Sequence, residues 1–452
     1  MSISTSTIVV ARARGRRLPR AASFWTIAGV FVLLMFAVSA PSPLYVVYQG
    51  HWHFSETTLT AVFAVYALAL LLTLLFTGSL SDRIGRRPVV LTALAVEIAA
   101  MAIFIVASGV AYLFVARILQ GLATGAATSA MGAGLIELQP RGQTRLAPLV
   151  NSSAPALGIA IGALVTSAFV QYGPAPTHLI FWLLIAGCAV GIAALLAMPE
   201  PGTRRPGALA SLRPRLAVPR AARRTFLVAV PVLVSIWALG GFYLSLGPSL
   251  AATLLASQNL LWGGFAIFLV MGIGGITSIA LRGAAPQPAI VNGCLALIVG
   301  LGVTLAGIVT DTGAVFMLGS AIAGFGFGLT FLGVFRTLVA LAPPQQRAGL
   351  IASIYTACYL GFSVPVVIAG IAATHVGLHD TSVVYASALV ALVAIALGGF
   401  LAQRRGAAIN DTATHPVPAA ETEAVPCPCT VPPARQPAEP RTEVPMHSAS
   451  RL

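Results

Sequence analysis

Ionisable side chains are scarce inside the long apolar segments of this sequence, and three of them have types that could do chemistry. Glu97 lies near the middle of the apolar segment 88–107, while Arg117 and Glu137 lie in the segment 111–138. An ionised side chain within a bilayer is costly, so one that is retained there marks a candidate functional site. A buried carboxyl beside a guanidinium can take up and release a proton, or it can form a fixed pair that neutralises both charges.

The spacing of Glu97 and Arg117 predicts that they lie close together. Their two segments are joined by a very short connection near Ser108 and Gly109, so the helices must run antiparallel. At about 1.5 Å of rise per residue, the two side chains lie within roughly one helical turn of each other in depth. Glu97 and Arg117 are therefore candidates for proton coupling, and a fixed ion pair that neutralises two buried charges remains open as well.

A compact charged turn joins the apolar segments 57–78 and 88–107, in a chain that is 8% charged and 58% hydrophobic. Its glycines allow close helix approach and a tight turn. Its aspartate can pair with an arginine or face a helix N-terminus, and its arginines can bind carbonyls at helix C-termini. The turn reads Gly78-Ser-Leu-Ser-Asp82-Arg83-Ile-Gly85-Arg86-Arg87-Pro88.

Long apolar segments must position these residues. The chain has 452 residues and a mean hydropathy of +0.91, and a spanning helix needs about 20 apolar residues. The sequence therefore predicts an all-α membrane protein with twelve transmembrane helices in two six-helix bundles. The expected segments are 24–46, 57–78, 88–107, 111–138, 146–171 and 177–198, followed by 225–248, 258–281, 287–309, 313–341, 347–375 and 380–402.

Composition divides the chain into five parts. The connection between the two sets of segments is rich in Pro and Arg, which indicates a linker. The C-terminal tail is rich in Pro, Ala, Thr and Glu, and we expect it to be disordered. The expected parts are a basic N-terminus 1–23, an N-terminal bundle 24–198, a linker 199–224, a C-terminal bundle 225–402 and a cytoplasmic tail 403–452.

The arginines predict the orientation in the membrane. They precede the first segment and follow every even-numbered one, whereas the odd-numbered connections contain none. By the positive-inside rule, both termini are cytoplasmic, in a multi-pass protein of the cell inner (plasma) membrane. The net charge of +14 is thus explained by topology, and we expect no nucleic-acid partner.

Several other functional classes lack their signatures. The chain contains no lysine, so it cannot carry a Gly-x-x-x-x-Gly-Lys-[Ser/Thr] nucleotide-binding loop. The acids inside the segments are too few and too scattered to suggest a metal site. We expect no enzymatic activity, no metal and no cofactor. The expected protein is a monomer whose partners are a small-molecule substrate, protons and membrane lipid.

The charged turn also carries a family resemblance. Its pattern Gly-x-Leu-x-Asp-Arg-x-Gly-Arg-Arg resembles the loop between helices 2 and 3 of the major facilitator superfamily. The resemblance covers about residues 20 to 405 and implies the fold of that superfamily. It also implies a transporter that works by alternating access.

Two features of segment 111–138 extend the resemblance. Arg117, Gln120 and Gly121 resemble an Arg-x-x-Gln-Gly motif of drug-exporting members, which is associated with proton coupling. Glu137 resembles an acid that forms a charge network with the helix 2–3 loop. The resemblance thus implies a conformational latch on the cytoplasmic side, made of Gly78, Asp82, Arg83, Gly85, Arg86, Arg87 and Glu137.

Prolines and one glycine are expected to bend helices. Ala40-Pro41-Ser42-Pro43 resembles a Pro-x-Pro motif of the same exporters. The exporter signature Gly-Pro-x-x-Gly-Gly has a poorer counterpart, because Ala154-Pro155-Ala156-Leu157-Gly158-Ile159 matches it only at Pro155 and Gly158. This departure bears on export and not on the fold.

Polar and aromatic residues inside the segments are candidates for a substrate cavity. Gln120, Asn151 and Tyr355 are polar groups within apolar spans, and we predict that they line the cavity. Aromatic side chains line a cavity or pack ordinarily, and sequence alone leaves both open. The aromatic candidates are Tyr45, Tyr48, Tyr66, Trp237, Tyr243, Phe331, Tyr355 and Tyr359.

These features together predict a secondary active transporter. The leading hypothesis is proton-coupled export of a small organic molecule, a drug or a metabolite. The alternatives are uptake or facilitated diffusion of a metabolite such as a sugar or organic acid, and a sensor or scaffold that transports nothing.

Overall fold

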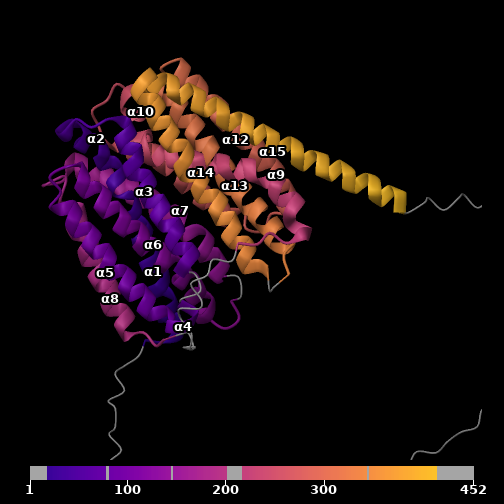
Figure 1. Cartoon of the computed structure of the whole chain (residues 1–452), viewed down its shortest axis with the longest axis horizontal. Helices are drawn as coiled ribbons and strands as arrows, with labels where there is room; N and C mark the ends of the chain where they lie inside the picture. Colours follow the sequence, from indigo (N-terminus) through magenta and orange to yellow (C-terminus); the bar gives the residue numbers. More distant parts are fainter. Residues whose placement is uncertain (1–17, 78–80, 144–145, 201–215, 344–345, 415–452) are drawn as a thin grey trace, which may run out of the picture. The chain divides into compact units, whose positions relative to one another are not determined.

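The structure is a computed structural model that describes residues 18–77, 81–143, 146–200, 216–343 and 346–414. Within these residues the regular structure is helical and contains no strand (Figure 1). Twelve of its helical spans are long and apolar enough to cross a membrane. A helix satisfies its backbone hydrogen bonds internally, as lipid requires. The predicted all-α fold with twelve spans is confirmed.

Each half of the chain contributes six spans. The N-terminal half contains α1 (Arg20–Ser39), α2 (Pro41–Trp52), α3 (Glu56–Thr77), α4 (Ser81–Ile84), α5 (Arg86–Ile105), α6 (Val110–Leu138), α7 (Leu146–Tyr172) and α8 (Leu179–Ala197). The C-terminal half contains α9 (Arg220–Ser245), α10 (Gly247–Leu254), α11 (Leu261–Ala280), α12 (Pro286–Val309), α13 (Gly313–Ala340), α14 (Arg347–Val376) and α15 (Leu378–Thr414).

Proline interrupts the first span. Helices α1 and α2 together form the span Arg20–Trp52, but α1 ends at Ser39 and α2 begins at Pro41. Proline is favoured in the first turn of a helix because its missing N–H would have no partner there. The same residue type inside a helix leaves a carbonyl one turn earlier without its usual donor. This break matters for the buried site described below.

The last helix is longer than expected. The sequence predicts a final segment that ends at residue 402, whereas α15 continues to Thr414. The Gln-Arg-Arg-Gly-Ala-Ala run after residue 402 contains mostly good helix formers, which explains the continuation. The rest of the predicted tail, from residue 415, lies outside the described residues.

Glycines let α12 and α13 pack closely. A Cβ atom at Gly326 would lie 2.6 Å from the backbone nitrogen of Leu297, well inside contact distance. The glycines recur every seven residues on both helices, so each set lies on one face. They are Gly293, Gly300 and Gly307 on α12, and Gly319, Gly326 and Gly333 on α13.

Two ends of the helix assembly can be distinguished. The charged end carries α4, the start of α5 and the end of α8, and the opposite end carries α2 and α10 (Figure 1). The two halves meet mainly through α7 with α11 and through α3 with α14. These two helix pairs therefore position the halves against each other.

Candidate functional site

A buried polar network lies in the N-terminal half. Glu97 on α5 and Arg117 and Gln120 on α6 each have 0% of their surface exposed. The Nη1 of Arg117 donates to Gln120 Oε1 at 2.5 Å, and Gln120 Nε2 donates to Glu97 Oε1 at 2.9 Å. Arg117 and Gln120 are three residues apart and so share one face of α6. The structure thus links Glu97 to Arg117 through an amide, with no direct ion pair between these two described residues.

The same network reaches α1 at its break. Gln120 Nε2 also donates to the carbonyl of Ala37 at 2.9 Å, and Arg117 Nη1 donates to the carbonyl of Val38 at 2.9 Å. In a continuous helix the Ala37 carbonyl would accept from the residue four positions later, which is Pro41 and has no N–H. Pro41 thereby frees the acceptor that Gln120 uses. The proline predicted to bend a helix thus supplies a backbone partner for the buried network.

Aromatic rings surround the Arg117 guanidinium. Its Nε donates to the hydroxyl of Tyr45 at 2.7 Å. Its carbon lies 4.9 Å from the ring centre of Tyr66, 5.6 Å from that of Tyr45 and 5.8 Å from that of Phe63. A cation over a ring face is attracted by the ring quadrupole, by about 2 kcal/mol where water is excluded. The rings therefore stabilise a buried charge whose hydrogen bonds to described residues go to Tyr45, Val38 and Gln120 and not to a carboxylate.

Two atoms of the network lack hydrogen-bond partners. They are Glu97 Oε2 and Arg117 Nη2, and both are buried. An unpartnered buried polar atom is costly and calls for an explanation. In this site the free carboxylate oxygen is a position that can take a proton without first breaking a hydrogen bond.

Two residues of the predicted latch, Arg86 and Glu137, form an ion pair at the charged end. Arg86 Nη2 lies 3.0 Å from Glu137 Oε1, which joins α5 to α6. Arg86 Nη1 also donates to the hydroxyl of Ser81 at 2.6 Å. Gly85 has a φ of 105°, a conformation that glycine adopts far more readily than other residues. Gly78 and the side chain of Asp82 lie outside the described residues, so their part in the latch stays a prediction.

The remaining arginines of the turn lie on either side of Gly85. Arg83 belongs to the short helix α4. Arg87, in the first turn of α5, donates from its guanidinium to the carbonyls of Met198 at 3.0 Å and Leu196 at 2.7 Å. These carbonyls lie at the C-terminal end of α8, where a positive charge is favourable. Arg87 thus binds helix C-terminal carbonyls, a role that the sequence allowed for arginines of this turn.

Glu200 completes this corner, and sequence reasoning missed it. Its carboxylate accepts from the backbone N–H of Arg86 at 2.7 Å and of Arg87 at 3.2 Å. A Cβ on Gly85 would lie 2.9 Å from the same carboxyl group, so glycine gives it room. Glu200 is the one acid of the sequence 199–224. A single acid in this basic stretch could have marked it as a partner for the arginines or for a helix N-terminus. Glu200, which follows α8, thus caps the N-terminus of α5. In return Arg87, in the first turn of α5, caps the C-terminus of α8.

The three residues predicted to line the substrate cavity lie on different helices. Asn151 Nδ2 donates to the carbonyl of Gly132 at 3.1 Å and so links α7 to α6. Tyr355 is partly exposed and lies far along the sequence on α14. Gln120 is fully buried, and its amide is used within the protein. The hydrogen bonds of Gln120 and Asn151 in the described part of the chain do not join these residues to each other or to Tyr355.

The remaining bending candidates lie in α2 and α7. Pro43 is buried in the first turn of α2, and Pro155 is inside α7. Gly158 lies against α1, where a Cβ would be 2.6 Å from the Cβ of Met35. Gly158 thereby allows α7 to approach α1 closely.

Hydrogen bonds between the two halves lie at the opposite end, as far as the described residues extend. Thr57 at the start of α3 and Thr374 near the end of α14 share a hydroxyl–hydroxyl contact of 2.9 Å. Gln171 Oε1 accepts from the backbone N–H of Leu260 at 2.9 Å, and Asn259 Nδ2 donates to Tyr172 at 3.2 Å. The structure therefore represents a state in which the halves are joined at that end.

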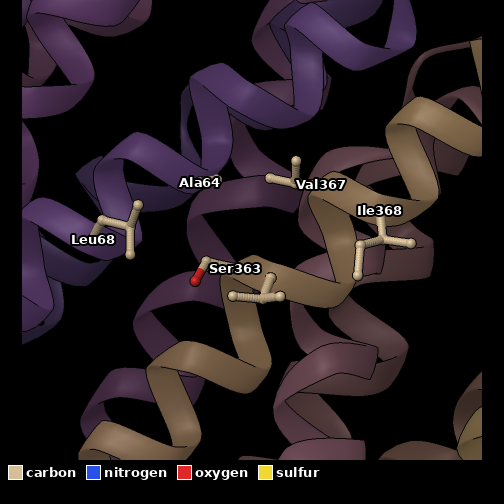
Figure 2. Close-up of a pocket in the computed structure, with 6 residues that line it drawn as sticks. Ala64, Leu68, Ser363, Val367 and Ile368 are labelled. Carbon is tan, nitrogen blue, oxygen red and sulfur yellow. The ribbon is translucent and has the colours of Figure 1, made fainter.

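A pocket of about 200 Å³ lies between α3 and α14, nearer the charged end than these contacts. It is lined by Ala64, Leu68, Ser363, Val364, Val367 and Ile368 (Figure 2). The Ser363 hydroxyl donates to the carbonyl of Tyr359, so the pocket presents an apolar surface. Among the described residues no group of three or more His, Cys, Asp or Glu could hold a metal ion.

Known proteins resemble this chain in sequence and in fold. Multidrug resistance protein MdtL of Escherichia coli O81 (strain ED1a) is 28% identical over 310 residues, which cover 66% of this chain and 75% of that protein. The human organic anion transporter MFSD10 (TETRAN) is 18% identical with a TM-score of 0.60, over 84% of this chain and all of that one. A peptide transporter POT in complex with alafosfalin is 15% identical with a TM-score of 0.66, over 87% and 97% of the two chains.

A family model decides the assignment. The model of the Major Facilitator Superfamily matches residues 27–366, and the solved structures above share the fold. The expectation drawn from the charged turn is confirmed. The chain therefore belongs to the Major Facilitator Superfamily, as a multi-pass membrane transporter and not an enzyme.

Proposed function

We propose that this transporter exports a small organic molecule, a drug or a metabolite, in exchange for protons. The observation that carries the proposal is the Glu97–Gln120–Arg117 network, in which one carboxylate oxygen is buried without a partner. A buried acid in a membrane transporter is the expected form of a proton relay. The similarity to a multidrug resistance protein supports export.

The proton acts at a defined atom in the proposed cycle. A proton binds Glu97 Oε2 from one side of the membrane and leaves to the other side after the halves rearrange. The ionised carboxylate holds the Gln120 amide by a charge-assisted hydrogen bond, and the neutral acid holds it more weakly. Gln120 also binds Arg117 and the Ala37 carbonyl, so protonation changes the forces at the break in α1. The two halves then alternate access to a site between them.

The proposed orientation places the charged end in the cytoplasm. The arginines of the described connections gather at that end, which the positive-inside rule assigns to the cytoplasmic side of the inner membrane. The hydrogen bonds between the halves lie at the opposite end. In this orientation the structure is closed toward the outside, and both termini are cytoplasmic. We further propose that the transporter works as a monomer in contact with membrane lipid.

Cysteine labelling tests this orientation. In a background without native cysteines, Ala175→Cys between α7 and α8 should react with a membrane-impermeant maleimide in intact cells. Gln143→Cys between α6 and α7 should react only after the membrane is permeabilised. Both positions are exposed, so a difference in labelling would reflect the side of the membrane and not burial of one position. Labelling of both from the same side would contradict the topology.

Flux in proteoliposomes tests the proposed function. The purified chain should move aromatic drug-like compounds against their gradient when a pH gradient is imposed, and a proton ionophore should stop this movement. Accumulation of a sugar or an organic acid in the direction of the proton gradient would support uptake instead. An absence of gradient-driven and exchange flux for every compound would favour a non-transporting sensor.

A further inference from the structure

Aromatic rings gather in the C-terminal half, in a group that the buried network does not use. Trp237 on α9 lies 4.9 Å from Tyr359, 5.8 Å from Phe362, 6.2 Å from Phe331 and 6.3 Å from Tyr355, measured between ring centres. These rings come from α9, α13 and α14. With Phe335, which lies 6.3 Å from Tyr355 and 5.6 Å from Phe331, they form what we call the aromatic wall: Trp237, Phe331, Phe335, Tyr355, Tyr359 and Phe362.

The wall does not lie on the outer face of α14. An exposed apolar stripe marks that outer face, and its members recur at three- and four-residue intervals. They are Leu360, Val364, Ile368 and Ile371, which are 42%, 49%, 61% and 45% exposed. At about 100° per residue, Tyr355, Tyr359 and Phe362 project from nearly the opposite side of the helix. Phe362 is buried, and the partial exposure of Tyr355 and Tyr359 is therefore toward the interior between the halves and not toward lipid.

The wall adjoins the proposed proton site. Phe362 contacts Phe63 on α3, with 4.9 Å between ring centres. Phe63 is in turn one of the rings over the Arg117 guanidinium. Along α14, Tyr359 and Tyr355 follow Phe362 toward the charged end. The wall therefore begins where the halves touch and continues toward the charged end. At that end no hydrogen bond joins described residues of the two halves.

The chemistry of the wall limits what it can bind. The indole N–H of Trp237 is buried without a partner, and the hydroxyls of Tyr355 and Tyr359 make no hydrogen bond to a described residue. Among the described residues, the arginine that lies over aromatic rings is Arg117, and the rings it contacts, Tyr45, Phe63 and Tyr66, do not belong to the wall. Arg336, next to Phe335 in sequence, instead donates to the carbonyl of Arg282 at 2.9 Å. The wall thus offers stacking faces and few hydrogen-bonding groups.

This surface suits one class of ligand. Flat ring systems stack on aromatic side chains, and a delocalised positive charge adds attraction to the ring faces. A sugar needs many hydrogen-bonding groups, and an anion needs a guanidinium or ammonium partner. We infer that the aromatic wall is the substrate-binding surface of the C-terminal half and takes planar aromatic molecules without negative charge. This inference rests on the proposed function and names its substrate class.

Binding measurements on the purified full chain in lipid nanodiscs test the inference. The probes are ethidium, a planar cation, and acridine, a planar and mostly neutral base at pH 7.5. The comparison compounds are 9-anthracenecarboxylate, a planar anion, and glucose. We expect the wild-type chain to bind both probes at least tenfold more tightly than either comparison compound. Equal affinity for the planar anion, or no binding of the probes, would overturn the substrate class.

Two tryptophan substitutions locate the binding surface. Trp237→Ala should weaken ethidium binding by about tenfold, which is the effect of losing one desolvated stacking partner. Trp237→Phe retains a ring and should weaken it by less than about threefold. Trp182→Ala is the matched control, because Trp182 on α8 is 57% exposed and away from the wall. Size-exclusion profiles and melting temperatures confirm that each variant is folded.

The outcomes separate this inference from the proposed function. Equal ethidium affinity in the wild type, Trp237→Ala and Trp182→Ala would overturn the wall as the binding surface, even if pH-driven flux persists. Ethidium binding that depends on Trp237 in a chain without flux would support the wall and contradict transport. Binding and flux that both fall in Trp237→Ala and not in Trp182→Ala would support both proposals.

Discussion

Replacement of Arg117 by alanine is expected to stop both proton-driven flux and counterflow exchange of substrate. The guanidinium donates to Tyr45, Val38 and Gln120, so its removal leaves several buried acceptors without a donor and Glu97 without a nearby positive charge. Breaking a buried network of this kind costs about 3–5 kcal/mol. We expect at least a hundredfold loss of flux, which proteoliposome assays with and without a pH gradient measure.

Lysine should not rescue the Arg117 site. The guanidinium uses two nitrogens to reach three acceptors on α1, α2 and α6. A lysine ammonium is a point charge without this planar fork. Arg117→Lys should therefore remain severely impaired while the protein folds. Normal gradient-driven flux in Arg117→Lys would show that only the charge matters.

Glu97→Gln separates a role of Glu97 in proton coupling from a purely structural role. Glutamine has nearly the same shape and can still accept the hydrogen bond from Gln120, but it cannot take up a proton. The variant should lose its response to a pH gradient and retain counterflow exchange. Glu56→Gln makes the same chemical change at the start of α3 and serves as the control. If Glu97→Gln keeps the wild-type pH dependence, Glu97 is structural and another group carries the proton.

The second large effect is expected at the charged end. Glu137→Gln removes the charge that pairs with Arg86 at 3.0 Å, where Arg86 is 10% and Glu137 33% exposed. Such a partly buried pair shifts the equilibrium between transporter conformations, because it stabilises only those conformations in which it is formed. We expect transport to fall by about tenfold, which corresponds to a shift of about 1.4 kcal/mol. Expression and ethidium binding should change much less.

A double-mutant cycle tests whether the two residues act together. Arg86→Ala, Glu137→Gln and the double variant are compared for flux, with Asp380→Asn as the control because Asp380 is exposed at the opposite end. If the ion pair carries the effect, the double variant should be no worse than Arg86→Ala alone. Fully additive losses would mean that the residues act independently and that they form no latch.

The sequence by itself determined the helical secondary structure and the number of membrane spans. Runs of about 20 apolar residues can satisfy their backbone in lipid only as helices, so twelve spans followed from hydropathy alone. The cost of burying a charge singled out Glu97 and Arg117, because both are ionisable residues placed deep inside apolar segments. The charged turn at 81–87 was visible because its residue types differ so strongly from the spans that flank it.

Only the tertiary structure decided which groups meet. Gln120 lies between Glu97 and Arg117, the freed Ala37 carbonyl accepts from it, and Glu200 caps α5. Likewise, Trp237 gathers rings from α13 and α14 that lie far away along the chain. Helix rotation and interhelical packing determine these contacts, because they set which side chain of one helix faces which of another. Hydropathy contains no information on that rotation, so the spans were predictable and the partners were not.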